Sequence, residues 1–345
     1  MKSVAPAEAA KSTTKRAAFC LVGPELPASI SASALGMAID VRQMALPHQL
    51  AHRFLFTPLL SRVMTAWQIR GVEMAREFVN IAGYRFISIP DRVEMRWPLR
   101  DFCVELGMKG TILLSEEGIN FFVSGTQQSI HQFLSHLDED ERFRAIPLKI
   151  SYSDNQPFKR MLVRIKKEII SMGHEEVKPE VFTAPSLSPK EFKSWLDEGK
   201  EVIVLDTRND YEMRLGKFEN AVDVGIKTFR EFPEAIKKLP EEMKGTPVVM
   251  YCTGGIRCEK ASVVMLEEGF ESVYQLEGGI LGYFEECGGD HWEGECFVFD
   301  RRVGLGPDLE ETASILCYEC REPLLPDEQK SDNYIVGTSC PYCVP

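Results

Sequence analysis

The chain of 345 residues lacks any uncharged apolar run of about 18 residues, the length that a membrane-spanning helix needs. We therefore expect no transmembrane helix. The chain also lacks an excess of positive charge, because 52 acidic residues outnumber 40 basic ones and give a formal net charge of −12. A globally acidic composition is not typical of a nucleic-acid-binding protein, although local basic patches decide that question.

The sequence also lacks the character of a secreted, disulfide-bonded scaffold. It has ten cysteines, but the chain is long enough for two or three domains with cores of their own. Four of the cysteines form two CxxC pairs, and a further one lies in a reactive-looking loop. This usage is typical of a reducing compartment, so we predict a cytoplasmic protein.

The most informative segment is the reactive loop, residues 252–257, which reads Cys-Thr-Gly-Gly-Ile-Arg. It follows a strand-like apolar run and precedes a helix-like segment that begins at Cys258. Backbone N–H groups and a helix N-terminus at such a turn stabilise an anion and lower the pKa of a thiol. We predict a catalytic thiolate at Cys252, supported by the turn residues and by a fixed positive charge at the end of the loop (Thr253, Gly254, Gly255, Ile256, Arg257). The alternative is a buried strand cysteine beside an ordinary glycine turn.

The spacing within the loop selects among cysteine chemistries. Cysteine-dependent phosphatases place Arg six positions after Cys, but here that position is Cys258 and Arg257 comes one residue earlier. The tighter loop resembles that of the rhodanese superfamily, whose cysteine carries sulfur as a persulfide. Many rhodaneses have Arg directly after Cys, and Thr253 in that place disfavours thiosulfate:cyanide sulfurtransferase activity.

The N-terminal half predicts two unlike regions. Residues 1–75 show no sustained alternation and have few acidic residues. One interpretation is a transit peptide; the one we favour is a disordered extension or a translation start placed too far upstream, with Met74 as the candidate true start. Residues 76–155 predict strand, helix, hairpin, helix and strand, which is the β-α-β-β-α-β order of a ferredoxin-like or acylphosphatase-like domain. The expected elements are 78–89, 93–106, 109–114, 119–124, 127–137 and 148–152, with Thr126 as the candidate N-cap of the helix over 127–137.

A basic bridge and linker, residues 156–187, follows that domain. Its start alternates apolar residues with five basic ones, three of which would share one face of a strand (Arg160, Arg164 and Lys166, beside Lys159 and Lys167). One interpretation is a solvated edge strand protected from aggregation by its charges. The other is a phosphate-binding face.

Residues 188–292 alternate helix and strand signals, including a helix capped by Ser188 and another over 229–239. The alternation predicts a parallel sheet flanked by helices with the reactive loop at a strand's carboxyl end. Asp206 and Arg208 resemble a strand-end Asp-x-Arg of rhodanese domains, which implies a structural aspartate and an arginine that braces nearby loops. The segments 216–222 and 276–280 resemble two further rhodanese turns. Cys258 is either a resolving thiol for Cys252 or a small residue at a helix start.

The C-terminal extension, residues 293–345, contains the two CxxC pairs, Cys317 with Cys320 and Cys340 with Cys343. Their spacing fits a tetrahedral four-thiolate zinc site, and we predict a structural zinc ribbon. The alternative, a redox-active CxxC pair, usually accompanies a thioredoxin-like βαβ context, which the tail lacks.

From residue 76 onward, the order of these regions resembles the tRNA uridine hydroxylase family. The resemblance implies oxygen-dependent 5-hydroxylation of the wobble uridine in tRNA, with dioxygen as co-substrate and the loop cysteine required. It also implies that the five basic bridge residues contact the phosphates of a tRNA anticodon arm. We find no flavin fingerprint, haem motif or 2-His-1-carboxylate signature, so Cys252, as thiolate, persulfide or sulfenate, is the candidate reactive centre.

Two other functions remain open from the sequence. A rhodanese-type sulfurtransferase would pass persulfide sulfur from Cys252 to a small acceptor or to RNA. A non-catalytic RNA-binding protein would use the loop only to hold an anion. The intact nucleophile together with Arg257 argues against the second of these.

Overall fold

The computed structural model describes residues 76–344, so the predictions for residues 1–75 lie outside the described part of the chain. The first domain has the predicted β-α-β-β-α-β order, closed by a fifth strand. Its elements are β1 (Phe78–Phe86), α2 (Arg92–Glu105), β2 (Lys109–Ser115), β3 (Gly118–Gly125), α3 (Gln127–Asp138), a 3₁₀ turn (Glu141–Phe143), β4 (Leu148–Ser153) and β5 (Met161–Ile165). The Thr126 side chain accepts a hydrogen bond from the Ser129 N–H, which makes it the N-cap of α3, as predicted.

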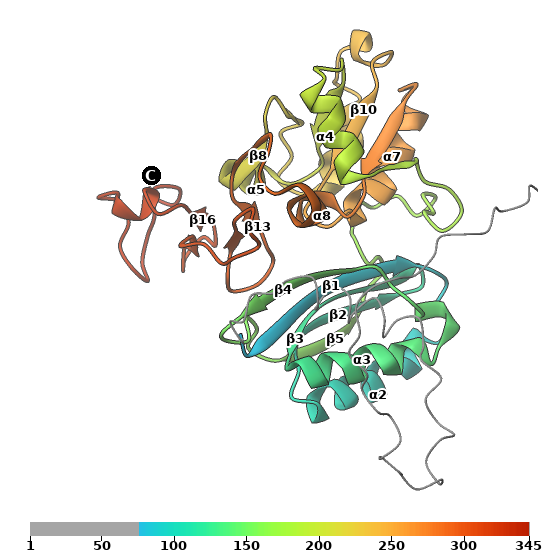
Figure 1. The fold of residues 1–345 in the computed structure, drawn as a ribbon, viewed down its shortest axis with the longest axis vertical. Coiled ribbons are helices and arrows are strands. Elements are labelled where there is room, and N and C mark those ends of the chain that lie inside the picture. The colour runs from blue at the N-terminus through green and yellow to red at the C-terminus, as the bar shows by residue number, and fades with distance from the viewer. Residues whose placement is uncertain (1–75, 345) are drawn as a thin grey trace, which may run out of the picture. The chain divides into compact units, whose positions relative to one another are not determined.

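The strands of this domain form one sheet in the order β4-β1-β3-β2-β5. All neighbours are antiparallel except β2 and β5, which are parallel. Helices α2 and α3 lie on the same face of the sheet (Figure 1). Phe121 of β3 is buried on that face and packs edge-on against Phe133 of α3, with ring centroids 5.6 Å apart. Successive side chains point to opposite faces of a strand, so Phe122 belongs to the face that carries no helix.

The basic bridge provides only a short strand. β5 lies at the edge of the sheet, with Met161 and Val163 buried and Arg164 exposed. Arg160 and Lys166 lie outside the strand. Of the three residues predicted to share one strand face, only Arg164 therefore stands within the strand, because the ladder with β2 extends only from Met161 to Ile165.

The second domain alternates helices and strands, as predicted. Its main sheet is entirely parallel, in the order β6-β11-β10-β7-β9. The elements are β6 (Ser186–Leu187), α4 (Pro189–Asp197), β7 (Ile203–Asp206), α5 (Asp210–Leu215), β8 (Gly216–Phe218), β9 (Val222–Asp223), α6 (Phe232–Ile236), β10 (Val248–Tyr251), α7 (Ile256–Glu267), β11 (Val273–Leu276) and α8 (Gly279–Cys287), with 3₁₀ turns at Phe229–Glu231 and Glu241–Met243. Ser188 caps α4 by accepting a hydrogen bond from the Glu191 N–H.

Two helices differ from their predicted bounds. The helix predicted over 229–239 is a 3₁₀ turn followed by the five-residue α6, because Pro233 can only occupy a first helical turn. The helix after the reactive loop begins at Ile256, two residues before the predicted Cys258. Gly255, with φ of 101°, turns the chain in the left-handed region and lets the helix start at once.

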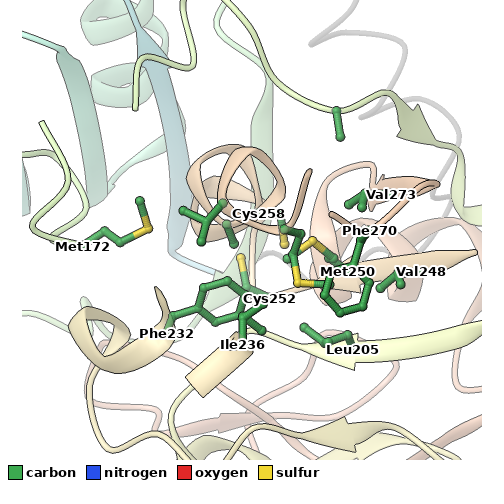
Figure 2. Packing of buried hydrophobic residues seen from close by; sticks show 14 of the residues in the cluster. Met172, Leu205, Phe232, Ile236, Val248, Met250, Cys252, Cys258, Phe270 and Val273 are labelled. Atoms are coloured by element: carbon green, nitrogen blue, oxygen red, sulfur yellow. The ribbon is translucent and has the colours of Figure 1, made fainter. Parts of the chain in front are cut away.

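Two hydrophobic clusters pack around the central strand β10. Val248, Met250 and Cys252 belong to one cluster, and Val249 and Tyr251 belong to the other. The alternation follows from the period of two in a strand, which sends successive side chains to opposite faces. Figure 2 shows Cys252 and Cys258 among Met250, Phe232 and Ile236 of the first cluster.

The C-terminal extension adds three small antiparallel pairs. β12 (Trp292–Gly294) pairs with β8, β13 (Cys296–Phe297) with β14 (Gly304–Leu305), and β15 (Ile315–Leu316) with β16 (Pro323–Leu324). A 3₁₀ turn spans Glu328–Lys330. No helix among the described residues has the length and apolar character to cross a membrane.

A buried ion cluster joins helix α7 to the first domain and the bridge. Lys260 is 1% exposed, and its Nζ lies 2.7 Å from Glu117 and 2.8 Å from Glu168. Glu168 also accepts hydrogen bonds from the N–H groups of Met172 and Gly173. Burial raises the pKa of Glu117. Burial also opposes the charge of Glu168, but Lys260 and the two N–H groups outweigh it, so the pKa of Glu168 is lowered.

Replacing Lys260 by Met should therefore destabilise the protein strongly. The substitution leaves two buried carboxylates without their cation, which costs about 3–5 kcal/mol when one partner of a buried pair is removed. Urea unfolding measures the loss. Adding Glu117→Gln and Glu168→Gln to Lys260→Met should recover part of it.

The matched control is Lys237→Met. It breaks an exposed ion pair between Lys237, which directly follows α6, and Glu234 within α6. It should change the free energy of unfolding very little. If Lys260→Met unfolds no more easily than this control, the buried cluster does not hold α7 in place.

Candidate active site

The reactive loop lies at the carboxyl end of β10, between the parallel neighbours β7 and β11. Its backbone wraps around the sulfur of Cys252, and the Gly255 N–H donates a hydrogen bond to Sγ over 3.1 Å. The loop then enters the first turn of α7, whose N-terminus carries a partial positive charge. The structure thus brings the six predicted loop residues together around one sulfur atom.

Backbone N–H groups at the start of α8 hydrogen-bond to the reactive loop. The Ile280 N–H donates to the Cys252 carbonyl over 2.9 Å, and the Leu281 N–H donates to the Thr253 carbonyl over 3.1 Å. A Cβ at Gly279 would collide with the Cys252 carbonyl oxygen. Only glycine permits this close approach, which explains the Gly-Gly pair that the sequence shares with rhodanese turns.

The surroundings of Cys252 favour its thiolate. Burial alone would raise the pKa of the thiol, but a hydrogen bond from Cys258, the charge of Arg257 and the loop N–H groups lower it to about 6. Cys258 has the opposite shift, because burial and its hydrogen bond to the Cys252 sulfur raise the pKa of Cys258 well above its ordinary value. Cys252 is therefore the more acidic thiol of the pair, and thiolate is the form in which a cysteine reacts as a nucleophile.

Arg257 stands at the end of the loop and is paired with a carboxylate. It forms a bidentate ion pair with Glu212 of α5, over 2.6 and 2.7 Å. Arg257 is 5% exposed and Glu212 is fully buried. Burial opposes the charge of Arg257, but Glu212 keeps its pKa above the ordinary value. The Thr253 hydroxyl also lies 3.5 Å from the Glu212 carboxylate.

Glu212 is a site residue that the sequence analysis missed. It stands three positions after Asn209 in a capping box, where its carboxylate accepts a hydrogen bond from the Asn209 N–H over 3.2 Å. The Asn-x-x-Glu pattern was a signal for the helix start. It gave no sign that the same carboxylate would meet Arg257, which lies 45 residues further along the chain.

Asp206 and Arg208 form a second buried pair beside the loop. Arg208 is fully buried and binds the Asp206 carboxylate through Nε and Nη2, the latter over 2.6 Å. Its guanidinium also donates to the carbonyls of Gly216 and Glu212. Arg208 thus connects the end of β7 to the middle of α5 and to the first residue of β8.

The loop opens into a cleft of about 930 Å³, lined by the reactive loop and by the helix-free face of the first domain. Cys252 itself is only 1% exposed. A Cβ at Gly254 would meet no other atom within 4 Å, so the loop is open beside that residue. The Tyr84 hydroxyl of β1 donates to Glu259 of α7 over 3.0 Å and also lines the cleft. Sequence alone gave no signal for this contact.

Lys149 of β4 lines the same cleft and was also missed. A Cβ at Gly278 would collide with its ammonium group, so the glycine leaves room for the lysine side chain. Burial lowers the pKa of Lys149, although the carboxylates of Glu285 and Glu277 raise it in part. The lysine thus places a partly desolvated cation at the side of the cleft near α8.

The five basic bridge residues are all exposed. Lys166 lines the cleft, and Lys167 forms an ion pair with Glu175. Arg164 stands opposite Leu113 in the parallel ladder, and Leu113 also lines the cleft. Arg164 therefore lies on the cleft side of the sheet. Lys159 and Arg160 precede β5, so the five charges are spread along the bridge rather than gathered on one face.

The four cysteines of the C-terminal extension come together. The sulfur atoms of Cys317, Cys320, Cys340 and Cys343 all lie within 4.8 Å of one another. Three of the separations are 3.5, 3.6 and 3.9 Å. A tetrahedral zinc ion with Zn–S bonds of about 2.3 Å requires sulfur atoms about 3.8 Å apart. These residues could hold a metal ion.

The two large domains match known families. Residues 78–169 match the UPF0176 acylphosphatase like domain, and residues 188–286 match the rhodanese-like domain. With the thiolate loop at the end of a parallel strand, the chain is a rhodanese-domain protein that carries an acylphosphatase-like domain in front. The predicted fold class is confirmed.

Relatives that share this layout define the family more closely. Proteins named tRNA uridine(34) hydroxylase from Cupriavidus taiwanensis and Cupriavidus necator are 51% and 52% identical over 273 residues, which is 78% of this chain and 97% of each relative. One from Burkholderia cenocepacia is 47% identical over 274 residues, covering 77% of this chain and 96% of the relative. The chain belongs to the tRNA uridine(34) hydroxylase family.

The electrostatics of the loop predict a pH dependence for the reactivity of Cys252. Thiolate is the reactive form, so alkylation by iodoacetamide should accelerate as the pH rises through about 6 and then level off. Mass spectrometry of the peptide that contains Cys252 follows the rate. Cys258→Ala removes a hydrogen-bond donor and should move the midpoint upward, whereas Cys258→Ser keeps a donor and should move it less. A wild-type midpoint near that of a free thiol, about 8.5, would contradict the assignment.

Proposed function

We propose that this protein hydroxylates the wobble uridine, position 34 of tRNA, at carbon C5, with dioxygen as co-substrate and Cys252 as the catalytic residue. The observation that carries the proposal is a stabilised thiolate at the edge of a large cleft. The family relationship supplies the substrate class, since the relatives are named as hydroxylases of this nucleoside. We assign the reaction to the cytoplasm, where the family's substrate is found.

The overall reaction defines what the site must provide. A C5–H bond is replaced by C5–OH, one oxygen atom of dioxygen enters the base, and the other leaves as water. The balance requires two electrons and two protons from an external donor. Cys252 takes part as thiolate, or after conversion to a persulfide or sulfenate. The carbon to be hydroxylated has to approach the sulfur from the cleft, which both Cys252 and Gly254 line.

The cleft suits a base that has left its stack. Sequence-specific RNA-binding proteins act mainly on single-stranded loops, whose bases can be turned out into a pocket. A volume of about 930 Å³ lies at the upper end of ordinary ligand pockets. The exposed bridge cations would then neutralise backbone phosphates of the anticodon arm (Lys159, Arg160, Arg164, Lys166 and Lys167).

Sulfur transfer from Cys252 is the second candidate function. The loop N–H groups that surround Sγ would equally stabilise a terminal persulfide sulfur. Thiosulfate is a poor donor candidate for this site, because Thr253 stands in the place of a rhodanese arginine and Arg257 is already paired with Glu212. A persulfide donor and an RNA acceptor fit the same cleft.

Nucleoside mass spectrometry of tRNA separates these functions. Cells that lack the gene should lose 5-hydroxyuridine and its derivatives, wild-type protein should restore them, and Cys252→Ser should not. Cys287→Ser, a half-buried cysteine of α8 outside the loop, is the matched control and should restore them fully. Loss of thiolated nucleosides instead would support sulfur transfer. Restoration by Cys252→Ser would overturn both catalytic proposals.

We also propose that the four-cysteine cluster binds a structural zinc ion. The sulfur separations fit a four-thiolate site, and the surrounding segment has little core of its own: Leu324 is its buried aliphatic residue beside Cys317 and Cys340. When bound, the ion would supply the cross-link that a small apolar core cannot. The site lies in the C-terminal extension and has no part in the reaction proposed for Cys252.

Metal analysis of the purified protein tests the zinc proposal. We expect about one zinc ion per chain, because four thiolates complete the coordination. Cys317→Ser should lose most of the metal and make the extension sensitive to trypsin, while Cys287→Ser should retain it. Wild-type protein purified without chelators that contains no zinc would contradict the proposal.

A further inference from the structure

The first domain turns a helix-free sheet face toward the cleft. The ladders place Ala82 of β1 opposite Phe122 of β3, and Phe122 opposite Thr111 of β2. All three line the cleft. Since paired residues share a face, the Phe122 ring stands between two small side chains in the middle of the sheet. A large flat group therefore has room to lie against it.

The Phe122 ring is free among the aromatic residues of this face. Tyr84 is engaged with Glu259, and Phe86 lies edge-on to Tyr84 and near the Lys260 ammonium. Within residues 76–344, no aromatic ring or cation contacts the ring of Phe122. The side chain is half-buried rather than covered, although it is a large apolar group in the centre of a sheet. Such a ring on an open sheet is a stacking platform for an unpaired base.

Phe122 is also close to the reactive loop. Tyr84, which bonds to helix α7, stands opposite Asn120, so Phe122 is its diagonal neighbour two residues along β3. Diagonal neighbours lie about 7–8 Å apart. The Phe122 ring therefore lies one diagonal neighbour away from Tyr84, the residue that bonds to helix α7. Neighbouring nucleotides of an open RNA loop can span this separation.

Cations on the same side complete the surface. Arg164 shares this face through its pairing with Leu113, and Lys166 lines the cleft directly. Both are exposed, and neither forms an ion pair within the described residues. Of the carboxylates that line the cleft nearby, Glu168 is bound to Lys260. A base on Phe122 would therefore have backbone phosphates within reach of two free cations.

We propose that Phe122 is a base-stacking platform for a nucleotide next to the target uridine, and that Arg164 and Lys166 bind the adjoining phosphates. The proposal rests on the proposed function, in which uridine 34 enters the cleft at Cys252. Turning that uridine out breaks its stacking with both neighbours. The Phe122 ring replaces the lost stacking for one of the neighbouring bases. It thereby holds the RNA loop open in front of the Cys252 sulfur.

A double-mutant cycle between protein and RNA tests the contact. The probe is a fluorescein-labelled anticodon stem–loop with uridine at position 34, together with the same RNA made abasic at position 33 or at position 35. Phe122→Leu should weaken binding of the intact stem–loop about 5- to 150-fold, the range of one base–aromatic stack. One of the two abasic RNAs should bind the wild type and Phe122→Leu equally, because the partner base is already absent.

Three further variants guard the interpretation. Phe122→Tyr keeps the ring and should bind like the wild type. Ala82→Leu fills the space beside the ring without removing it and should weaken binding as Phe122→Leu does, which covers the case in which Phe122→Leu does not fold. Trp97→Leu removes an exposed aromatic residue of α2, on the helical side of the sheet, and should bind normally.

The outcome also separates this proposal from the function on which it rests. If wild-type protein restores 5-hydroxyuridine in cells and binds the stem–loop, but Phe122→Leu binds as tightly as wild type or neither abasic RNA shows coupling, the stacking platform is wrong and the enzyme function stands. If wild-type protein neither restores the nucleoside nor binds the stem–loop, the proposed function fails first.

Discussion

The buried ion pair between Arg257 and Glu212 is the interaction on which the rest of the site depends. It connects the first turn of α7 to α5, and both side chains are almost completely removed from water. Burying two charges costs desolvation that their attraction only partly offsets, so such a pair contributes more to geometry than to net stability. Here the pair fixes the geometry of the reactive loop, which lies between β10 and α7. The Thr253 hydroxyl of that loop also contacts the Glu212 carboxylate. Glu212 in turn is fixed by its helix cap and by the Arg208 contact to its carbonyl.

The same pair separates two effects of a positive charge. Arg257 remains close enough to Cys252 to favour the thiolate, together with the loop N–H groups and the Cys258 thiol. Arg257 also lines the cleft, but its Nη1 and Nη2 are bound to the Glu212 carboxylate, so its charge is already paired before an anion arrives. A phosphatase or thiosulfate sulfurtransferase needs that second function of the arginine. A site that must accept a neutral pyrimidine base beside a thiolate does not need it. The arrangement therefore favours a nucleobase over a small inorganic anion as the group that approaches Cys252.

Local patterns in the sequence predicted local features well. The alternation of strands and helices, the caps at Thr126 and Ser188 and the position of Cys252 at a strand end all depend on residues close together in the chain. The interactions that complete the site do not. Glu212 and Arg257 are 45 residues apart, Glu168 and Lys260 are 92 apart, and Tyr84 and Glu259 are 175 apart. A single sequence gives no periodicity for such pairs, and a glutamate in a helix cap looks the same whether it faces water or a buried arginine. The early start of α7 was missed for a related reason, since it depends on the left-handed backbone of Gly255.

Helix α7 unites the two domains in one site. Its first turn supplies Arg257 and the N-terminal dipole for the thiolate. Glu259 and Lys260, two and three positions further on, bind Tyr84 of β1 and the carboxylates of Glu117 and Glu168. Contacts that fix the nucleophile and contacts that fix the sheet thus lie within four consecutive residues, less than about one and a half helical turns. A helix segment that short moves as a unit, so the sheet face cannot shift without disturbing the loop around Cys252. The helix-free face of the first domain therefore belongs to the proposed active site, of which the rhodanese loop forms one side.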